Sequence, residues 1–308
     1  MAGSLPPHRA PVLNAGARHN DGVSPGGDWA RYWRAPDRDV EAMHAHFVRH
    51  AYDRHSHETY SFGITESGAQ AFTCRGGSHT SSEGMVMAFN PDEPHDGHAA
   101  TDSGFTYKIV HIGPEQVADV LADRAGAPAG LPLFVEPVRH DPALATALRR
   151  LYSALVARNT LARDEALAST VTAMVDRGPG ARERVTAPGS AGARRAMELL
   201  RADSAREFGM GELAAVAGCS RYALHRAFVA ECGLAPSAYQ RQLRLRAARK
   251  LLAAGHTAAA AAIEAGFADQ AHLTRWFRRC YGITPAAYAR AATHSSGTRV
   301  SLSGLTTS

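Results

Sequence analysis

The strongest constraint on the fold is an internal repeat near the C-terminus of the 308-residue chain. Residues 224–239 and 273–288 are identical at seven of sixteen positions when they are aligned at an offset of 49, whereas ordinary residue frequencies would give about one match. The shared positions include a Leu-x-Arg-x-Phe run, followed at fixed spacing by Gly, Pro and Tyr. A repeat of this kind predicts one small structural unit that is present twice.

Each copy of the repeat is predicted to form a helix, a tight turn and a second helix. In the first copy the helix covers Met210–Ala217 and ends at Gly218, because glycine takes a positive φ without strain. Ser220 is expected to cap the next helix, since its hydroxyl can accept a hydrogen bond from a free backbone N–H. Leu224 and Phe228 lie four residues apart, so both are predicted to face the core.

The second copy follows the same pattern and is joined to the first by an arginine-rich helix, predicted over Ser237–Ala254. Its first helix is predicted over Ala258–Ala265, where Gly266 interrupts it and Asp269 caps the helix that follows. The positions predicted to face inward are Leu213, Val216 and Ala217 in the first copy and Ile263, Leu273 and Phe277 in the second.

Positive charge is concentrated in the region that holds the repeat. Residues 194–294 carry a net charge of +8, whereas the rest of the chain carries −3. A basic domain on a slightly acidic body is typical of a protein that binds a polyanion. A helix-turn-helix places its second helix in the DNA major groove, and two copies on one rigid helix could reach successive grooves about 34 Å apart. The alternative is a helical bundle with two packed hairpins.

The N-terminal half has the pattern of a β-rich domain between about Trp29 and Ile112. Short apolar or aromatic runs alternate there with turn residues such as Gly, Asn, Pro and Asp, which favours an all-β sandwich or barrel. The strands predicted individually are Tyr60–Thr65, Ala69–Cys74, Met85–Phe89 and Phe105–His111.

A helical pattern begins at Pro114. Leucines recur there at steps of three and four residues, and a second helix is predicted over Asp164–Met174. Two such helices form a pair that is well suited to joining subunits. The leucines that carry the pattern are Leu144, Leu148, Leu151 and Leu155.

The whole region that holds the repeat is similar to the DNA-binding domain of the AraC/XylS family of bacterial transcription regulators, and its second half is the most diagnostic part. The resemblance covers about 100 residues and includes Gly266-Phe267, Leu273-x-Arg275-x-Phe277, Gly282 and Pro285-x-x-Tyr288. It implies base-reading positions on the second helix of each unit, with Arg226 and Arg275 free either to pair with guanine or to clamp phosphate. The residues concerned are Arg221, Tyr222, His225 and Arg226 in the first unit, and Gln270, Ala271, His272, Thr274 and Arg275 in the second.

The N-terminal part resembles the cupin-like sensor domain of the same family, through Arg54-His55-Ser56-His57-Glu58-x-Tyr60 and Asn90-Pro91-x-x-Pro94-His95-Asp96. The cupin metal pattern would place a carboxylate at position 61 or 62, where this chain has Ser61 and Phe62. The resemblance therefore favours a pocket for a small organic effector. Its predicted lining is His55, His57, Tyr60, Phe89 and His95.

Two alternatives remain for these histidines. His55, His57 and His95 could form a three-histidine metal site of the kind that zinc or iron accepts. They could also be structural residues at strand ends, satisfied by backbone partners. We predict no cofactor and no catalytic residue, because the carboxylate of the enzyme pattern is missing.

The sequence predicts an α+β protein of two domains. An N-terminal cupin-like β-barrel with trailing helices is followed by an all-α domain with two helix-turn-helix units joined by a long helix. The expected divisions are a disordered tail (1–27), the sensing domain (28–140), a helical dimerisation segment (141–176), a linker (177–193), the DNA-binding domain (194–294) and a second disordered tail (295–308).

These features predict a transcription factor that binds operator or promoter DNA as a homodimer and responds to a small-molecule effector, with RNA polymerase as a further candidate partner. The alternatives are a metal-dependent cupin enzyme that carries a DNA-binding domain and a non-specific architectural DNA binder. No stretch approaches the roughly 18 apolar residues that span a bilayer, and residues 1–27 lack the apolar core of a secretory signal. We therefore expect a cytoplasmic protein with no membrane partner.

Overall fold

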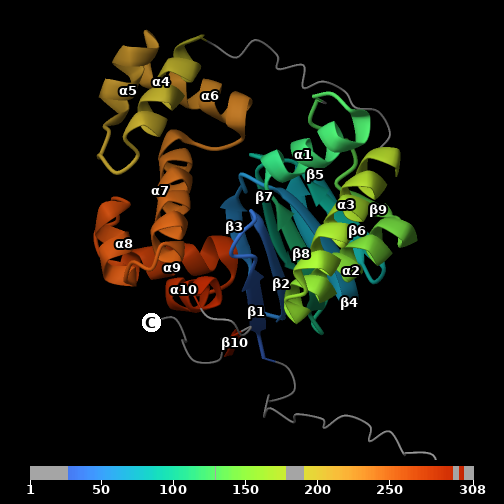
Figure 1. Ribbon diagram of the computed structural model, residues 1–308. Helices are drawn as coiled ribbons and strands as arrows, with labels where there is room; N and C mark the ends of the chain where they lie inside the picture. Colours follow the sequence, from blue (N-terminus) through green and yellow to red (C-terminus); the bar gives the residue numbers. More distant parts are fainter. Residues whose placement is uncertain (1–26, 129, 178–190, 294–297, 302–308) are drawn as a thin grey trace, which may run out of the picture.

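The computed structural model describes residues 27–128, 130–177, 191–293 and 298–301. It confirms the predicted α+β fold class, with a strand-rich domain followed by a helical domain that lies beside it (Figure 1). The strands are β1 (Trp29–Arg34), β2 (Val40–Phe47), β3 (Tyr52–His55), β4 (Tyr60–Cys74), β5 (Gly77–Ser82), β6 (Met85–Phe89), β7 (His95–Ala99), β8 (Phe105–Ile112), β9 (Val138–His140) and β10 (Thr298–Ser301).

The sheet is antiparallel and runs in the order β10-β1-β2-β8-β4-β6-β9, while β5 and β7 also pair with β4, and β3 pairs with β7. The two predicted strands Tyr60–Thr65 and Ala69–Cys74 are in fact one strand, β4. Its register against β8 shifts between Thr65 and Ser67, and Gly68 has φ +70°. The residues predicted as a turn therefore form a bend that lets β4 leave one set of neighbours for another.

Three helices cover one face of this sheet: α1 (Pro114–Ala125), α2 (Pro142–Ala157) and α3 (Thr160–Arg177). Asp141 caps α2, since its carboxylate accepts a hydrogen bond of 2.9 Å from the backbone N–H of Leu144. The face predicted from the leucine spacing is buried against the sheet, at Leu144, Leu148, Leu151 and Leu155.

The C-terminal domain consists of α4 (Ala191–Ala202), α5 (Met210–Ala217), α6 (Arg221–Cys232), α7 (Pro236–Ala253), α8 (Ala258–Glu264), α9 (Gln270–Tyr281) and α10 (Pro285–Thr293). The predicted turn signals are confirmed: Gly218 has φ +68°, and Ser220 caps α6 by accepting from the N–H of Ala223 at 3.2 Å. Asp269 caps α9 in the same way, at 2.6 Å from the N–H of His272.

For two positions the prediction that the side chain faces inward is wrong. Val216 is 39% exposed and Ile263 is 64% exposed. Both lie on short helices, α5 and α8, where alanines make the close contacts with the neighbouring helices. Ala214 and Ala262 are buried at those contacts, so the larger residues beside them point outward.

The C-terminal tail also differs from expectation. Residues 295–308 were expected to lack structure, yet Thr298–Ser301 forms β10 and pairs antiparallel with β1. The predicted linker overlaps the ends of α3 and α4, and its residues 178–190 lie outside the described residues, as do residues 1–26 of the predicted N-terminal tail. No helix among the described residues is long and apolar enough to cross a membrane.

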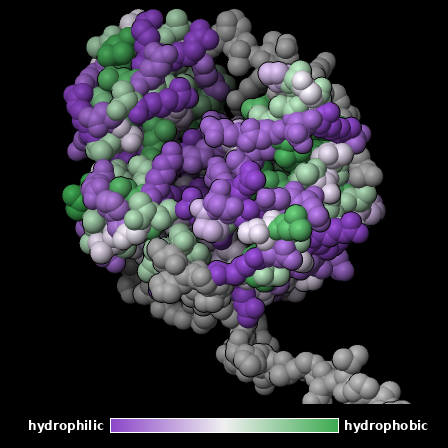
Figure 2. All heavy atoms as spheres, in the orientation of Figure 1, coloured by the Kyte–Doolittle hydropathy of each residue, from purple (hydrophilic) through white to green (hydrophobic). Residues whose placement is uncertain are grey.

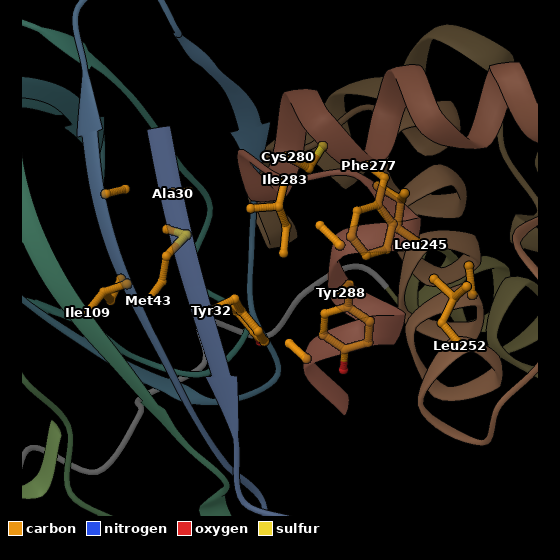
Figure 3. Close-up of a cluster of buried hydrophobic side chains, with 14 of the residues drawn as sticks. Ala30, Tyr32, Met43, Ile109, Leu245, Leu252, Phe277, Cys280, Ile283 and Tyr288 are labelled. Carbon is orange, nitrogen blue, oxygen red and sulfur yellow. The ribbon is translucent and has the colours of Figure 1, made fainter. Parts of the chain in front are cut away.

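The two domains share one hydrophobic core. Buried residues of β1, β2 and β8 pack with buried residues of α7, α9 and α10 in a single cluster. Figure 3 shows this boundary, with Ala30, Met43 and Ile109 on the strands, Leu245 and Phe277 on the helices, and Ile283 in the loop between α9 and α10. The sheet is therefore covered on one face by α1–α3 and on the other by the second helix-turn-helix unit.

Candidate functional site

The outward face of α6 carries the first group of predicted DNA-contacting residues. Arg221, Tyr222, His225 and Arg226 are all exposed, and Tyr222 is 72% exposed. The guanidinium of Arg226 lies 5.7 Å from the centre of the Tyr222 ring. Leu224 and Phe228 face the core as predicted, both with no exposed surface, so α6 divides cleanly into a buried stripe and a polar face.

The second helix, α9, is arranged in the same way but less completely. Gln270, Ala271 and Arg275 are exposed, whereas His272 and Thr274 are half-buried. The ring of His272 packs edge-on against Phe267, with the ring centres 5.4 Å apart. His272 therefore supports the turn that precedes α9, which distinguishes it from the freely exposed members of the predicted set.

The surface around these helices is largely polar. Figure 2 shows hydrophilic residues over most of the visible face, with hydrophobic residues as separate spots. Among the described residues, the exposed large hydrophobic side chains are distributed over the chain, and they include Tyr222 on α6 and Ile263 on α8. The exposed faces of α6 and α9 thus suit a hydrated, charged partner better than a dry protein interface.

A cavity of about 60 Å³ lies at the boundary between the two domains. Four of the five predicted ligand-binding residues line it: His55, His57, Phe89 and His95. Tyr60 does not, which corrects that prediction. It belongs to the cluster on the opposite face of the sheet, where its hydroxyl donates a hydrogen bond of 2.7 Å to the carbonyl oxygen of Pro132.

The helical domain supplies part of the cavity wall, and this was not foreseen from the sequence. Its contributions come from α7, α9, α10 and the loop between α9 and α10: Arg249, Cys280, Tyr281, Ile283 and Tyr288. A molecule in this cavity would consequently touch the sensor and the DNA-binding domain at the same time.

Three buried histidines stand together on the sensor side. One ring nitrogen from each of His55, His57 and His95 lies within 4.8 Å of the others. Burial lowers the pKa of His95 to about 4, and it lowers the pKa values of His55 and His57 well below the usual 6.5. All three rings are therefore neutral at pH 7 and can offer lone pairs.

A fourth buried histidine, His111, lies behind this group. Its ring centre is 4.6 Å from that of His57, and its Nδ1 forms a hydrogen bond of 2.8 Å with the Ser61 hydroxyl. Burial lowers its pKa to about 4 as well. His111 therefore extends the neutral, polar lining of the cavity toward β8.

Glu41 on β2 is the acidic centre of the domain boundary. Burial alone would raise its pKa, but the attraction of Arg249 and a hydrogen bond from Tyr32 outweigh that effect and hold the pKa below its ordinary value. Arg249 pairs directly with the Glu41 carboxylate. Tyr288 donates a further hydrogen bond to it at 2.9 Å. Figure 3 shows Tyr32 and Tyr288 lying close together across the boundary.

One stripe of α7 docks onto the segment between β3 and β4, which contains Ser56 and His57. Gln242, Arg246 and Arg249 lie four and three residues apart, so they share one face of the helix. The side-chain N–H of Gln242 donates to the carbonyl oxygen of Ser56 at 2.7 Å. Arg246 donates to the Ser56 hydroxyl at 3.1 Å and to the Asp92 carboxylate at 2.6 Å. The segment between His55 and His57 is thus bound directly to the helix that joins the two DNA-binding units.

Comparison with known families matches both domains. The AraC-like ligand binding domain family matches residues 37–171. A helix-turn-helix domain family matches residues 213–291. The two matches together span the sensor with its trailing helices and both helix-turn-helix units, in the order predicted from the sequence.

Two similar proteins match most of this chain. YbfI, an uncharacterized HTH-type transcriptional regulator of Bacillus subtilis, is 24% identical over 240 residues, which is 77% of this chain and 87% of that protein. An apo form of ToxT from Vibrio cholerae superposes with a TM-score of 0.52 at 12% identity, over 86% of this chain and 96% of that chain. ToxT bound to an unsaturated fatty acid gives a TM-score of 0.52 at 11% identity, over 89% and 99% of the two chains.

At this level of identity the likeness to ToxT shows the fold alone, while the family matches carry the assignment. They favour a regulator over a cupin enzyme with an added DNA-binding domain. The chain therefore belongs to the AraC/XylS family of transcription regulators, with an N-terminal ligand-binding domain and a C-terminal double helix-turn-helix domain.

Proposed function

We propose that this chain binds specific double-stranded DNA sites through α6 and α9, and that a small-molecule effector in the cavity between the domains changes this binding. The observation that carries the proposal is the shared wall of the cavity, to which His57 contributes from the sensor and Tyr281 from α9. A ligand there makes contacts in the docked arrangement that it loses when the domains separate. It therefore shifts the population between the two arrangements.

The size and lining of the cavity limit the effector. A cavity of about 60 Å³ is smaller than the roughly 150 Å³ cavity that holds benzene in a protein core. The docked form suits a very small molecule or an ion, and a longer molecule such as the fatty acid bound to ToxT would require the domains to move apart. The one arginine among the lining residues, Arg249, already pairs with Glu41, so an acidic effector would compete with that carboxylate.

The DNA-binding part of the proposal is tested by selecting bound sequences from a random DNA pool with the full chain. We expect enriched sites with two blocks of preferred bases about 10 base pairs apart, because the two units would read successive turns of the duplex. A pool that shows no enrichment, although the protein retains DNA, would indicate a non-specific binder instead.

We further propose that the chain acts as a homodimer in the cytoplasm, with α2 and α3 as the contact between subunits. Support comes from two exposed apolar side chains near the turn between these helices, Val156 at 38% and Leu161 at 70% exposure. RNA polymerase is proposed as a further partner at the promoter, which a transcription assay with purified polymerase and a selected site would test. We propose no catalytic activity.

A further inference from the structure

The hydrogen bonds of two histidines fix where their protons lie. Nδ1 of His55 is 2.7 Å from the carbonyl oxygen of Asp53, and Nδ1 of His95 is 2.9 Å from the carbonyl oxygen of Glu93. A carbonyl oxygen only accepts, so each neutral ring carries its proton on Nδ1 and leaves Nε2 as a bare lone pair. This is the arrangement in which backbone carbonyls orient metal-binding histidines.

The third ring brings another nitrogen to the same point. Nε2 of His57 lies 3.2 Å from Nε2 of His55, and the nearest nitrogens of all three rings fall within 4.8 Å. One proton on His57 could satisfy the lone pair of His55 or that of His95, but not both. A cation at the centre would satisfy all three at once.

The spacing agrees with tetrahedral coordination for the closest pair. Two nitrogens at about 2.0–2.1 Å from a zinc ion lie about 3.3 Å apart, against the 3.2 Å between His55 and His57. A pair as wide as 4.8 Å would have to draw together by about 1.5 Å on binding, within the reach of a side-chain rotation. The ring of His95 stacks on that of Phe89, with ring centres 3.9 Å apart.

We propose that His55, His57 and His95 bind one divalent first-row transition metal ion, of the zinc class, in an open three-histidine site. Neutral imidazoles suit zinc, iron, copper and nickel, and three protein ligands leave a fourth position for water or an exogenous ligand. That position faces the cavity lined by Tyr281 and Arg249. The metal ion would therefore anchor a small effector inside the cavity.

The site is connected to the DNA-binding domain through Ser56, the residue between two of the ligands. Its carbonyl oxygen and hydroxyl accept hydrogen bonds from Gln242 and Arg246 of α7. Drawing His55 and His57 onto an ion moves this segment and hence the surface on which α7 docks. This regulatory consequence rests on the proposed function, whereas metal binding itself does not.

The test uses the full chain without a histidine tag, stripped with a chelator and titrated with Zn²⁺ in competition with a chromophoric zinc indicator. We expect one bound ion per chain. His95→Gln should lower the zinc affinity at least 100-fold, since it removes one of three protein ligands. The matched control is His98→Gln on the same strand, an exposed histidine, which should leave the zinc affinity unchanged.

Failure of the wild-type chain to retain Zn²⁺, or an unchanged affinity in His95→Gln, would overturn the proposal. A second measurement does not depend on the folding of a variant. Wild-type chain loaded with Co²⁺ should show the intense visible absorption of a four-coordinate nitrogen site, and the weak absorption of the hydrated six-coordinate ion would contradict it. Both measurements are made without DNA, so a failure of the proposed function cannot be mistaken for a failure of the metal site.

Discussion

Arg249 of α7 and Glu41 of β2 form an ion pair where the sensor meets the DNA-binding domain, and only 13% and 3% of the two side chains are exposed. The two residues are 208 positions apart in the chain. Tyr32 and Tyr288 add a hydrogen bond to the same carboxylate from each domain. One acidic side chain therefore joins polar groups from both domains.

Replacing that acid should loosen the docking. Glu41→Gln leaves Arg249 buried without a counter-ion, which costs about 3–5 kcal/mol. We expect a lower urea midpoint and a larger radius of gyration in small-angle X-ray scattering. The matched control is Asp53→Asn, which breaks the 3.5 Å pair with Arg279 at a solvent-exposed part of the same boundary and should change stability by less than about 1 kcal/mol. Equal effects of the two variants would contradict the central role of Glu41.

Arginines on the two recognition helices should contribute to specific DNA binding. Arg226→Ala and Arg275→Ala are each expected to weaken binding to a selected site by about 1–3 kcal/mol, if the side chain pairs with a base. Gel-shift titrations against the selected site and against unrelated DNA provide the measurement. Arg49→Ala, an exposed arginine between β2 and β3, removes the same charge and should have little effect. An equal loss on both DNAs would assign the arginine to phosphate.

Acidification should destabilise the chain between pH 6.5 and about pH 4. Burial lowers the pKa values of His44 and His50 to about 4, so below pH 6.5 the unfolded chain binds protons that the folded chain does not. The free energy of unfolding is therefore highest above pH 6.5. It decreases as the pH is lowered toward 4, by about 2–3 kcal/mol for each histidine. Urea midpoints of metal-free protein from pH 7.5 to 4.5 test this.

His50→Asn should make that pH dependence shallower, because it removes one of the buried histidines whose pKa is lowered. The control His98→Gln replaces an exposed histidine and should leave the slope as in the wild type. A midpoint that stays constant across this range would show that the buried histidines do not govern acid stability.

The proposed dimer contact makes a separate prediction. Leu161→Glu places a charge on an apolar side chain that is 70% exposed on α3, so it should raise the dimer dissociation constant in sedimentation experiments by at least tenfold. Ile263→Glu is the matched control, because Ile263 is 64% exposed on α8 and lies outside the proposed contact. A monomer–dimer equilibrium that responds equally to both changes would contradict the assignment.

Features encoded by neighbouring residues were predictable from the sequence. Gly218, Ser220 and Asp269 act within one turn of the helices that they end or begin, so both helix-turn-helix units were predicted closely. The cluster of His55, His57 and His95 was also predicted, since the resemblance to a known domain brings distant residues together.

Other features depend on packing that no local pattern records. Tyr60 was assigned to the cavity, but β4 is covered on both faces, so its apolar residues do not show which face points where. Ile263 sits on a helix of seven residues, too short for a clear periodicity. The pairing of Glu41 with Arg249 joins two domains, and neither residue has a sequence signal that identifies its partner.

The pairing of β10 with β1 has a consequence for how a signal could pass between the domains. Ser301 lies opposite Trp29 and Thr298 opposite Tyr32, so the chain returns to the first strand of the sensor domain after leaving α10. The DNA-binding domain is consequently attached to the sensor at both of its ends. A domain held in this way stays tethered to the sensor when the two separate, and regulation would then act through the orientation of the two recognition helices.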